Sequence, residues 1–129
     1  MGDYDDRMKR GFELIAKMGF PQERMLKQKE AYPAIYELTV GHLFGDIWSR
    51  PHLSLREREL ITMAAIIAQG RPMGVGTHFG SAVKNGITKE QIMELIIHVG
   101  AYAGWPVMSH AIAQFNQAME ELAEERKKK

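Results

Sequence analysis

The chain has 129 residues, 45% of them hydrophobic and 26% charged, and its formal net charge is +1. Residues 1–129 therefore suit a single globular domain, and the near-neutral charge disfavours nucleic acid as a partner. Cysteine is absent, which excludes disulfides, thiolate metal sites and cysteine nucleophiles. The acidic N-terminus does not resemble a signal peptide, and the longest apolar stretch is too short to span a membrane. We therefore expect a cytoplasmic protein with no membrane partner.

Helix signals run along the whole chain, whereas strand signals are almost missing. We therefore predict an all-α fold of six or seven helices around one core. The expected helices span residues 5–18, 21–31, 34–44, 56–69, 72–84, 89–102 and 106–126.

The first three predicted helices differ in polarity. Apolar residues recur at helical spacing in the first, and Gly19 follows it as a stop signal. The second helix is polar. The third has an apolar side formed by Ile35, Leu38 and Leu43.

The two central helices have the clearest boundaries. Ser54 is a candidate N-cap with Glu57 three residues later, which is a capping-box pattern. The helix that follows is apolar nearly all round beyond its first turn, and such a helix is usually central to the core. The next helix contains His78 and ends at Asn85-Gly86, a favourable C-cap pair.

The last two helices begin with a second capping box, Thr88 to Gln91. The positions expected to be buried after it are Ile92, Leu95, Ile96 and Val99. Nine methionines, together with Trp48 and Trp105, make the apolar content large for so small a domain. We therefore expect a homo-oligomer, and the alternative is that methionine fills irregular gaps in the core.

Glu59 and His78 are the strongest candidates for chemistry. Glu59 lies about ten residues before the turn between the central helices, and His78 lies about seven residues after it. In an antiparallel hairpin the two residues are therefore offset along the helix axes by no more than roughly 5 Å. A carboxylate in apolar surroundings needs a partner, and an imidazole is a suitable one. The alternative is that Glu59 caps its helix or forms a salt bridge near the helix N-terminus and that His78 is a structural core histidine.

The other four histidines show no metal-ligand spacing, so no metal site is expected. They are His42, His52, His98 and His110. Gly74 and Gly76 stand at the start of the helix that contains His78, where glycine is costly. They either permit close approach of a ligand or another helix, or mark a helix that starts late.

Arginines gather around the central helices. Arg50 precedes them, Arg56 and Arg58 lie in the first turn, and Arg71 follows the first helix. Arginines beside an apolar pocket would suit a small carboxylate substrate. The alternative is a solvated helix start with exposed ion pairs.

Three segments in order resemble the carboxymuconolactone decarboxylase family. Residues 45–58 resemble its G-x-x-W-x-R-P-x-L-x-x-R-x-R signature. Residues 78–88 resemble H-x-x-x-A-x-x-x-G-[VIL]-[ST], and residues 98–106, HVGAYAGWP, resemble h-x-x-x-Y-A-G-[WFV]-P. The resemblance covers about residues 40–120 and keeps register throughout.

The wider superfamily includes the alkylhydroperoxidase AhpD, with the pattern E-x11-C-x2-C-x3-H. Counted from Glu59, its two cysteines fall on Arg71 and Gly74, and its histidine falls on His78. The acid and the base are kept while both thiols are missing. The resemblance therefore favours Glu59 and His78 as catalytic residues and excludes a thiol peroxidase.

The resemblance implies an AhpD-like helical domain that assembles into trimers or hexamers and acts without a cofactor. The family's decarboxylases act on γ-carboxymuconolactone in the breakdown of the aromatic compound protocatechuate. His78 would deliver a proton and Glu59 would tune it. Arg50, Arg71 and Trp48 would bind the carboxylate substrate.

One stretch departs from the family pattern. Family decarboxylases usually carry E-E-L-x-x-H at the histidine, whereas residues 73–77 here include no acidic residue. Two other functions stay open for this reason. They are a non-catalytic oligomer that binds a small acid, and an isomerase or aldolase on the same scaffold.

Overall fold

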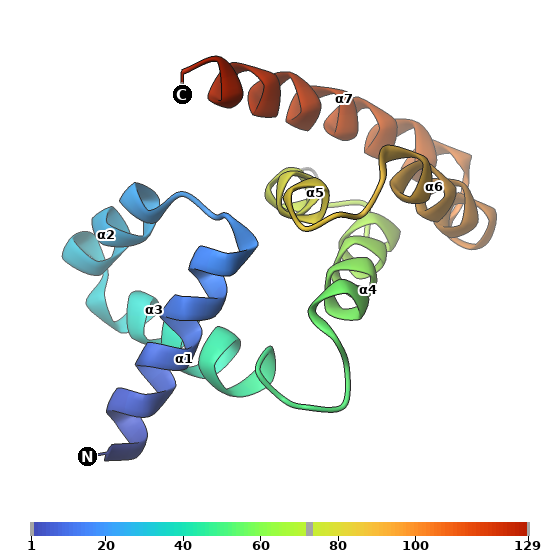
Figure 1. The fold of residues 1–129 in the computed structure, drawn as a ribbon. Coiled ribbons are helices and arrows are strands. Elements are labelled where there is room, and N and C mark those ends of the chain that lie inside the picture. The colour runs from blue at the N-terminus through green and yellow to red at the C-terminus, as the bar shows by residue number, and fades with distance from the viewer. Residues whose placement is uncertain (1, 72–73, 129) are drawn as a thin grey trace. The chain divides into compact units, whose positions relative to one another are not determined.

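The computed structural model describes residues 2–71 and 74–128, and within these ranges it contains seven α-helices, one π-helix and no strand (Figure 1). The all-α prediction is therefore confirmed. In chain order the elements are α1 (Gly2–Met18), α2 (Gln22–Ala31), α3 (Pro33–Glu37), the π-helix η1 (Leu38–Ile47), α4 (Leu55–Ala68), α5 (Val75–Lys84), α6 (Lys89–Ala103) and α7 (Trp105–Lys127).

The chain divides into two compact units, Met1–Leu55 (unit 1) and Arg56–Lys129 (unit 2). Each unit has a hydrophobic cluster of its own. That residues 1–129 act as a single domain stays a prediction, as does the cytoplasmic location. None of the described helices has the length and hydropathy that crossing a bilayer requires.

Unit 1 is built on the packing of α1 against η1 (Figure 1). Its buried core consists of Ile15, Met18, Tyr36, Val40 and Phe44. Gly11 on α1 faces the backbone carbonyl of Val40 so closely that a Cβ at this position would overlap it. The close approach of the two helices therefore depends on this glycine. By contrast, α2 has no buried residue, as its polar sequence predicts.

The third predicted helix, 34–44, is two elements in the structure. α3 ends at Glu37 and the π-helix η1 continues to Ile47, where the Trp48 backbone N–H donates to the Leu43 carbonyl five residues earlier. The residues predicted as the apolar side are exposed: Ile35 by 50%, Leu38 by 61% and Leu43 by 39%. The buried stripe is Tyr36, Val40 and Phe44. The predicted apolar side is therefore wrong, because the side that packs against α1 is a different one.

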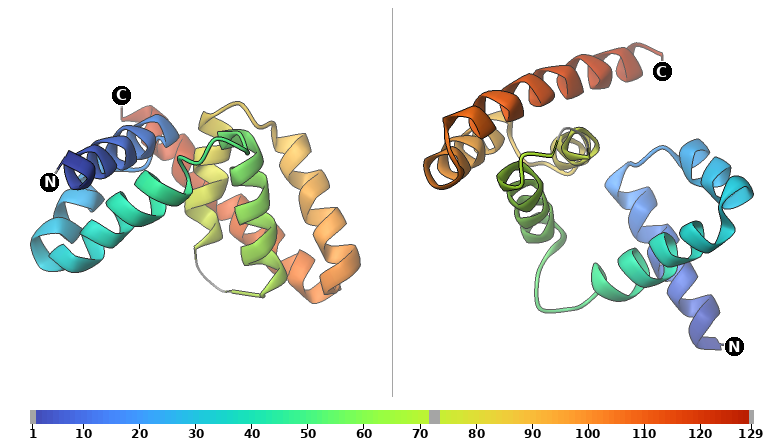
Figure 2. Two further views of the ribbon diagram at one scale, coloured as in Figure 1. Left: turned by 90° about the horizontal axis from the view of Figure 1, so that it is seen from below. Right: turned by 180° about the vertical axis from the view of Figure 1, so that it is seen from behind.

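Unit 2 is held together by α7, which packs along both α5 and α6 (Figure 2). Phe79 of α5 and Phe115 of α7 meet edge to face in the core, with ring centroids 5.4 Å apart. The capping box predicted before α6 is confirmed, because the Gln91 N–H donates to Thr88 Oγ1 and the Thr88 N–H donates to Gln91 Oε1, both at 3.0 Å. Of the residues predicted to be buried after it, Ile92 and Ile96 are fully buried, and Leu95 and Val99 are partly buried.

α5 begins at Val75, later than predicted. Pro72 and Met73, where the predicted helix starts, lie outside the described residues. Gly74 has φ of 102°, which L side chains rarely adopt and which is not helical, so α5 starts after it. Apart from the adjoining residues and the backbone of the same helix, no described atom lies within 4 Å of a Cβ built on Gly74 or Gly76. A late helix start, rather than a close helix contact, therefore explains Gly74.

α4 packs on the core of unit 2 by one face. Glu59, Met63 and Ile67 are buried, whereas Ile61 on the other side is 54% exposed. The prediction that α4 is central to the core therefore holds for one face only.

Candidate active site

Two helices of unit 2 bring an acid and a base together. Glu59, in the second turn of α4, is fully buried. His78 lies near the middle of α5, and 16% of its side chain is exposed. Its Nδ1 is 3.4 Å from Glu59 Oε2. The proximity expected from residue spacing is therefore present in the structure.

A third side chain of the pair's surroundings, Ser81, is not among the residues predicted from the sequence. It lies one turn after His78 on α5, is only 2% exposed, and its Oγ donates to Glu59 Oε1 at 3.1 Å. The two oxygens of the carboxylate therefore have different partners. The spacing of three residues from His78 was the available signal, because it places both side chains on one face of the helix.

The contact between Glu59 and His78 determines which nitrogen of the imidazole can act on a ligand. An ionised carboxylate can only accept hydrogen bonds, so its contact with Nδ1 favours the proton on that nitrogen. Nε2 is then the atom that can exchange a proton with a ligand. The distance of 3.4 Å is longer than a charge-assisted hydrogen bond of about 2.7–2.9 Å. Catalytic contacts of this kind often shorten only when substrate binds.

Arg71 lies in the connection between α4 and α5 and is exposed. Its Nε donates to Gln69 Oε1 at 3.0 Å, and its carbonyl accepts from Gln114 Nε2 at 3.4 Å. Within the described residues its side chain therefore contacts its own segment, not Glu59 or His78. Its contact with substrate stays a prediction.

Trp48 and Arg50 belong to unit 1 and follow η1. The Trp48 ring packs 5.4 Å from the Phe44 ring, between centroids. Arg50 is exposed, and its backbone N–H donates to the Ile47 carbonyl at 3.2 Å. Both residues lie outside unit 2, and their roles in substrate binding stay predictions.

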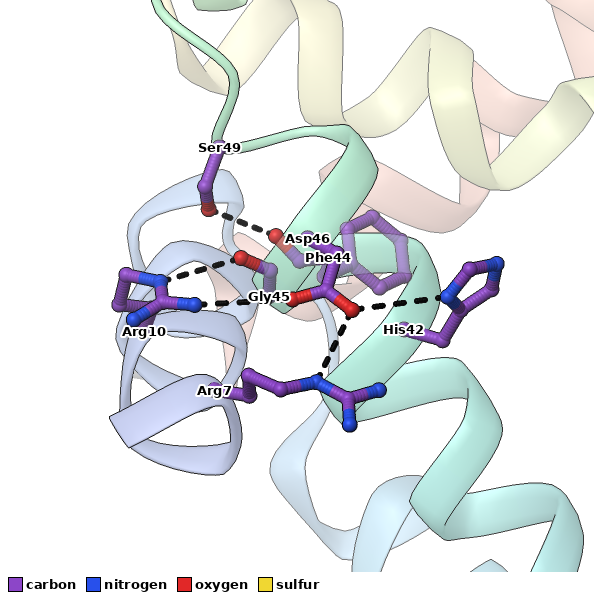
Figure 3. A network of polar contacts seen from close by, with 7 residues as sticks. All are labelled: Arg7, Arg10, His42, Phe44, Gly45, Asp46 and Ser49. Atoms are coloured by element: carbon purple, nitrogen blue, oxygen red, sulfur yellow. Dashed lines mark hydrogen bonds and ion pairs between the residues drawn. The ribbon is translucent and has the colours of Figure 1, made fainter. Parts of the chain in front are cut away.

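Unit 1 contains a second pair of a histidine and a carboxylate, within the network that Figure 3 shows. His42 Nδ1 is 3.5 Å from Asp46 Oδ2, and Asp46 also pairs with Arg7 at 2.9 Å and Arg10 at 3.6 Å. The His42 and Asp46 side chains are 57% and 36% exposed. Because the two arginines lie on α1 and Asp46 lies on η1, we assign this network to holding these helices together. Among residues 2–71 and 74–128, no three acidic, histidine or cysteine side chains form a group that could hold a metal ion.

An open groove of about 650 Å³ also lies in unit 1, lined by aromatic and charged side chains of α1, α2 and α3. None of the predicted site residues lines it. Burial of Tyr36 in its wall raises the pKa of the hydroxyl above the usual 10.0, and Tyr4 nearby raises it further. Lys29 Nζ lies 5.7 Å from the centroid of the Tyr36 ring. The groove is therefore a separate feature from the Glu59–His78 pair.

Comparisons with known proteins point to one family. The model of the carboxymuconolactone decarboxylase family matches residues 33–117. The 4-carboxymuconolactone decarboxylase of Acinetobacter baylyi is 35% identical over 79 residues, which cover 61% of this chain and 59% of that protein. The nitrosuccinic acid decarboxylase of Metarhizium robertsii is 30% identical over 88 residues, which cover 68% of this chain and 62% of that protein. The chain thus spans about three fifths of the length of the curated relatives it matches.

Proposed function

Because the chain belongs to the carboxymuconolactone decarboxylase family, we propose that it is a lyase that releases carbon dioxide from a small carboxylic acid. Glu59 and His78 are the proposed catalytic residues. The observation that carries the proposal is the 3.4 Å contact between the fully buried Glu59 carboxylate and His78 Nδ1. The names of both relatives, each a decarboxylase, support the reaction type.

Decarboxylation leaves an electron pair on carbon, and the substrate must hold it. In γ-carboxymuconolactone the conjugated lactone carbonyl can take this pair and become an oxyanion. The delocalised anion is then protonated on the ring carbon beside the carbonyl, which gives the enol-lactone. The protein's tasks are to orient the carboxylate, stabilise the developing oxyanion and deliver one proton, so the proposed reaction uses no cofactor.

His78 delivers that proton in the proposed mechanism. In its doubly protonated form, Nδ1–H points to Glu59 Oε2 and Nε2–H is given to the substrate carbon. The carboxylate holds the ring in one orientation and stabilises its positive charge. Water returns the proton to Nε2 after the product leaves.

The proposed substrate is a small acid in which an electron-accepting group is conjugated with the bond to the departing carboxylate. γ-Carboxymuconolactone is the first candidate and would place the protein in the breakdown of aromatic compounds. Nitrosuccinic acid meets the same requirement, since a nitro group on a carboxyl-bearing carbon can take the electron pair. Arg50 and Arg71 are proposed to bind the substrate's carboxylates, and Trp48 to pack against its apolar side.

The proposed assembly is a homo-oligomer, a trimer or a hexamer. Its support is the number of large apolar side chains that unit 2 exposes. They are Ile61 (54%), Ile97 (48%), Tyr102 (86%) and Trp105 (63%). Large apolar side chains that gather in one exposed patch are typical of surfaces that a partner covers, and we propose that these four face a neighbouring subunit.

A second candidate function is a non-catalytic protein that binds a small acid. It is favoured by the stretch before His78, where family decarboxylases usually carry acidic residues. Residues 73–77 include none, and α5 begins only after Gly74. In this alternative, Glu59 and His78 stabilise the fold, and the ligand is bound without turnover.

One experiment separates the two candidates. Purified protein is given γ-carboxymuconolactone or nitrosuccinic acid, carbon dioxide release is followed, and the thermal shift caused by each acid is measured in parallel. Release of carbon dioxide that is lost in His78→Ala supports the decarboxylase. A thermal shift without release supports the binding protein, and neither signal with either acid contradicts both.

A further inference from the structure

We infer that Ser81 is a positioning residue of the site, which holds the Glu59 carboxylate so that its second oxygen faces His78. The catalytic consequence rests on the proposed function. The geometry does not, because it concerns three side chains within unit 2.

The Glu59 carboxylate needs more than one partner where it lies. The residue is fully buried, and an ionised carboxylate taken out of water is costly unless hydrogen bonds replace its hydration. Within the described residues its side chain has two polar partners, Ser81 Oγ on Oε1 and His78 Nδ1 on Oε2. Among the described residues, Ser81 therefore supplies one of the two polar contacts that replace water around this group.

The division of the two oxygens fixes the plane of the carboxylate. The last torsion of a glutamate side chain has a broad energy profile, so a single contact at one oxygen leaves the group free to turn. The hydrogen bond of 3.1 Å from Ser81 to Oε1 removes this freedom and directs Oε2 toward Nδ1. Because Ser81 and His78 are on the same helix, α5 fixes the Glu59 carboxylate and the His78 imidazole relative to one another.

The backbone of Ser81 is itself anchored. Its carbonyl accepts from the Asn85 backbone N–H at 3.0 Å and from Asn85 Nδ2 at 2.9 Å, at the end of α5. The hydroxyl is therefore presented from a fixed point of the helix. A carboxylate held from such a point keeps its orientation while the imidazole gains and loses a proton.

Ser81 acts through Glu59 and is not a nucleophile. Its Oγ donates to Glu59 Oε1, so its link to the site is through the carboxylate. It is also only 2% exposed, which keeps substrate away from it.

The test uses the whole protein and the two nitrogens of His78. Nitrogen-15 NMR of the imidazole is recorded for the wild type, Ser81→Ala and Ser81→Thr, with His78→Ala to assign the signals. Ser109→Ala, at an exposed serine of α7, is the matched control. Alanine is the best helix former, so Ser81→Ala is expected to fold, and Ser81→Thr keeps the hydroxyl.

We expect Ser81→Ala to shift the His78 signals away from the form protonated on Nδ1, Ser81→Thr to restore them in part, and Ser109→Ala to leave them unchanged. In activity assays Ser81→Ala should lower kcat about tenfold with little change in KM, since Ser81 does not touch substrate. Thermal destabilisation with unchanged His78 signals and unchanged kcat would mean a purely structural role and would overturn the inference. If the wild type shows no turnover, the decarboxylase proposal fails, and the NMR comparison alone still supports or rejects Ser81 as the residue that positions Glu59.

Discussion

Each unit of the chain holds a histidine beside a carboxylate, at nearly the same distance but in different surroundings. His42 and Asp46 lie one turn apart on η1, with 3.5 Å between Nδ1 and Oδ2. His78 and Glu59 come from two helices, 19 residues apart in sequence, with 3.4 Å between Nδ1 and Oε2. The exposed fractions are 57% and 36% for the first pair, and 16% and 0% for the second. Distance does not distinguish the two pairs, whereas burial does.

The comparison shows what burial adds to a contact. An exposed ion pair contributes about 0–1 kcal/mol, because water solvates both partners equally well when they separate. A buried carboxylate has no water to replace a lost partner, so the groups around it are held in place. The His78 imidazole and the Glu59 carboxylate are therefore held in one orientation, whereas His42 is open to solvent and Asp46 is shared with two arginines.

The largest expected effect separates the two histidines. His78→Ala should lower kcat for decarboxylation about 10³-fold, because it removes the proposed proton donor. His42→Ala should change kcat by less than about twofold, since its pair is solvated. Steady-state carbon dioxide release measures both, and equal losses in the two variants would remove the distinction between the units.

The two carboxylates give the next comparison. Glu59→Gln keeps the shape of the side chain and removes its charge, so we expect kcat to fall about 10- to 100-fold with a smaller change in KM. Asp46→Asn is the matched change in unit 1 and should leave kcat of the folded protein unaffected. A Glu59→Gln variant as active as the wild type would show that the charge beside His78 has no catalytic role.

The packing of the units predicts opposite effects for two glycines. Gly11→Ala places a Cβ onto the Val40 carbonyl and should destabilise unit 1 by about 2 kcal/mol or more. Gly80→Ala adds its Cβ to open space within α5 and should stabilise unit 2 by about 0.5–1 kcal/mol.

The two tryptophans allow each unit to be measured separately, because Trp48 lies in unit 1 and Trp105 in unit 2. Urea unfolding of Gly11→Ala is followed by Trp48 fluorescence in a Trp105→Phe background. Gly80→Ala is followed by Trp105 fluorescence in a Trp48→Phe background. Unchanged unfolding of unit 1 in Gly11→Ala would show that α1 and η1 are not in the close contact described.

The smallest effect concerns pH and unit 1. Burial, with Tyr4, raises the pKa of Tyr36 in the folded state above its usual 10.0. The folded state therefore disfavours the ionised hydroxyl. This contribution to stability is fully present below pH 10 and is lost as the pH rises through the raised pKa.

Urea unfolding at about pH 8 and about pH 10.5, followed by Trp48 in the Trp105→Phe background, checks this prediction. Unit 1 should lose stability between the two values, and Tyr36→Phe should lose less. An equal loss in both variants would assign the pH dependence to other groups.

Much of the fold was predictable because helix ends have local chemical signals. The capping box from Thr88 to Gln91 satisfies N–H groups with side chains three residues apart, so it can be recognised in any sequence. The π-helix has no such signal. Its buried stripe of Tyr36, Val40 and Phe44 depends on how α1 lies against it, which is a tertiary contact.

The candidate site was predictable in part for the same reason. The spacing of Glu59 and His78 from one turn allows their contact, and the resemblance to the family favours the pair over separate structural roles. Ser81 belongs to no recognisable motif. Its role can be inferred only once the Glu59 carboxylate is known to be buried. The roles of Trp48 and Arg50 rest on the resemblance to the family and on no local chemical signal, so they stay predictions.

The central claim is that His78 delivers a proton to the substrate after carbon dioxide leaves, and isotope labelling tests it most directly. Decarboxylation of γ-carboxymuconolactone is run in D₂O under initial-rate conditions, and the ring methylene beside the lactone carbonyl of the product is examined by NMR. A proton held on a fixed imidazole reaches one face of the anion, so the wild type should give deuterium on a single face, and His78→Ala should lose both the rate and this selectivity. Equal deuterium on both faces with the wild type, or an unchanged rate in His78→Ala, would contradict the account.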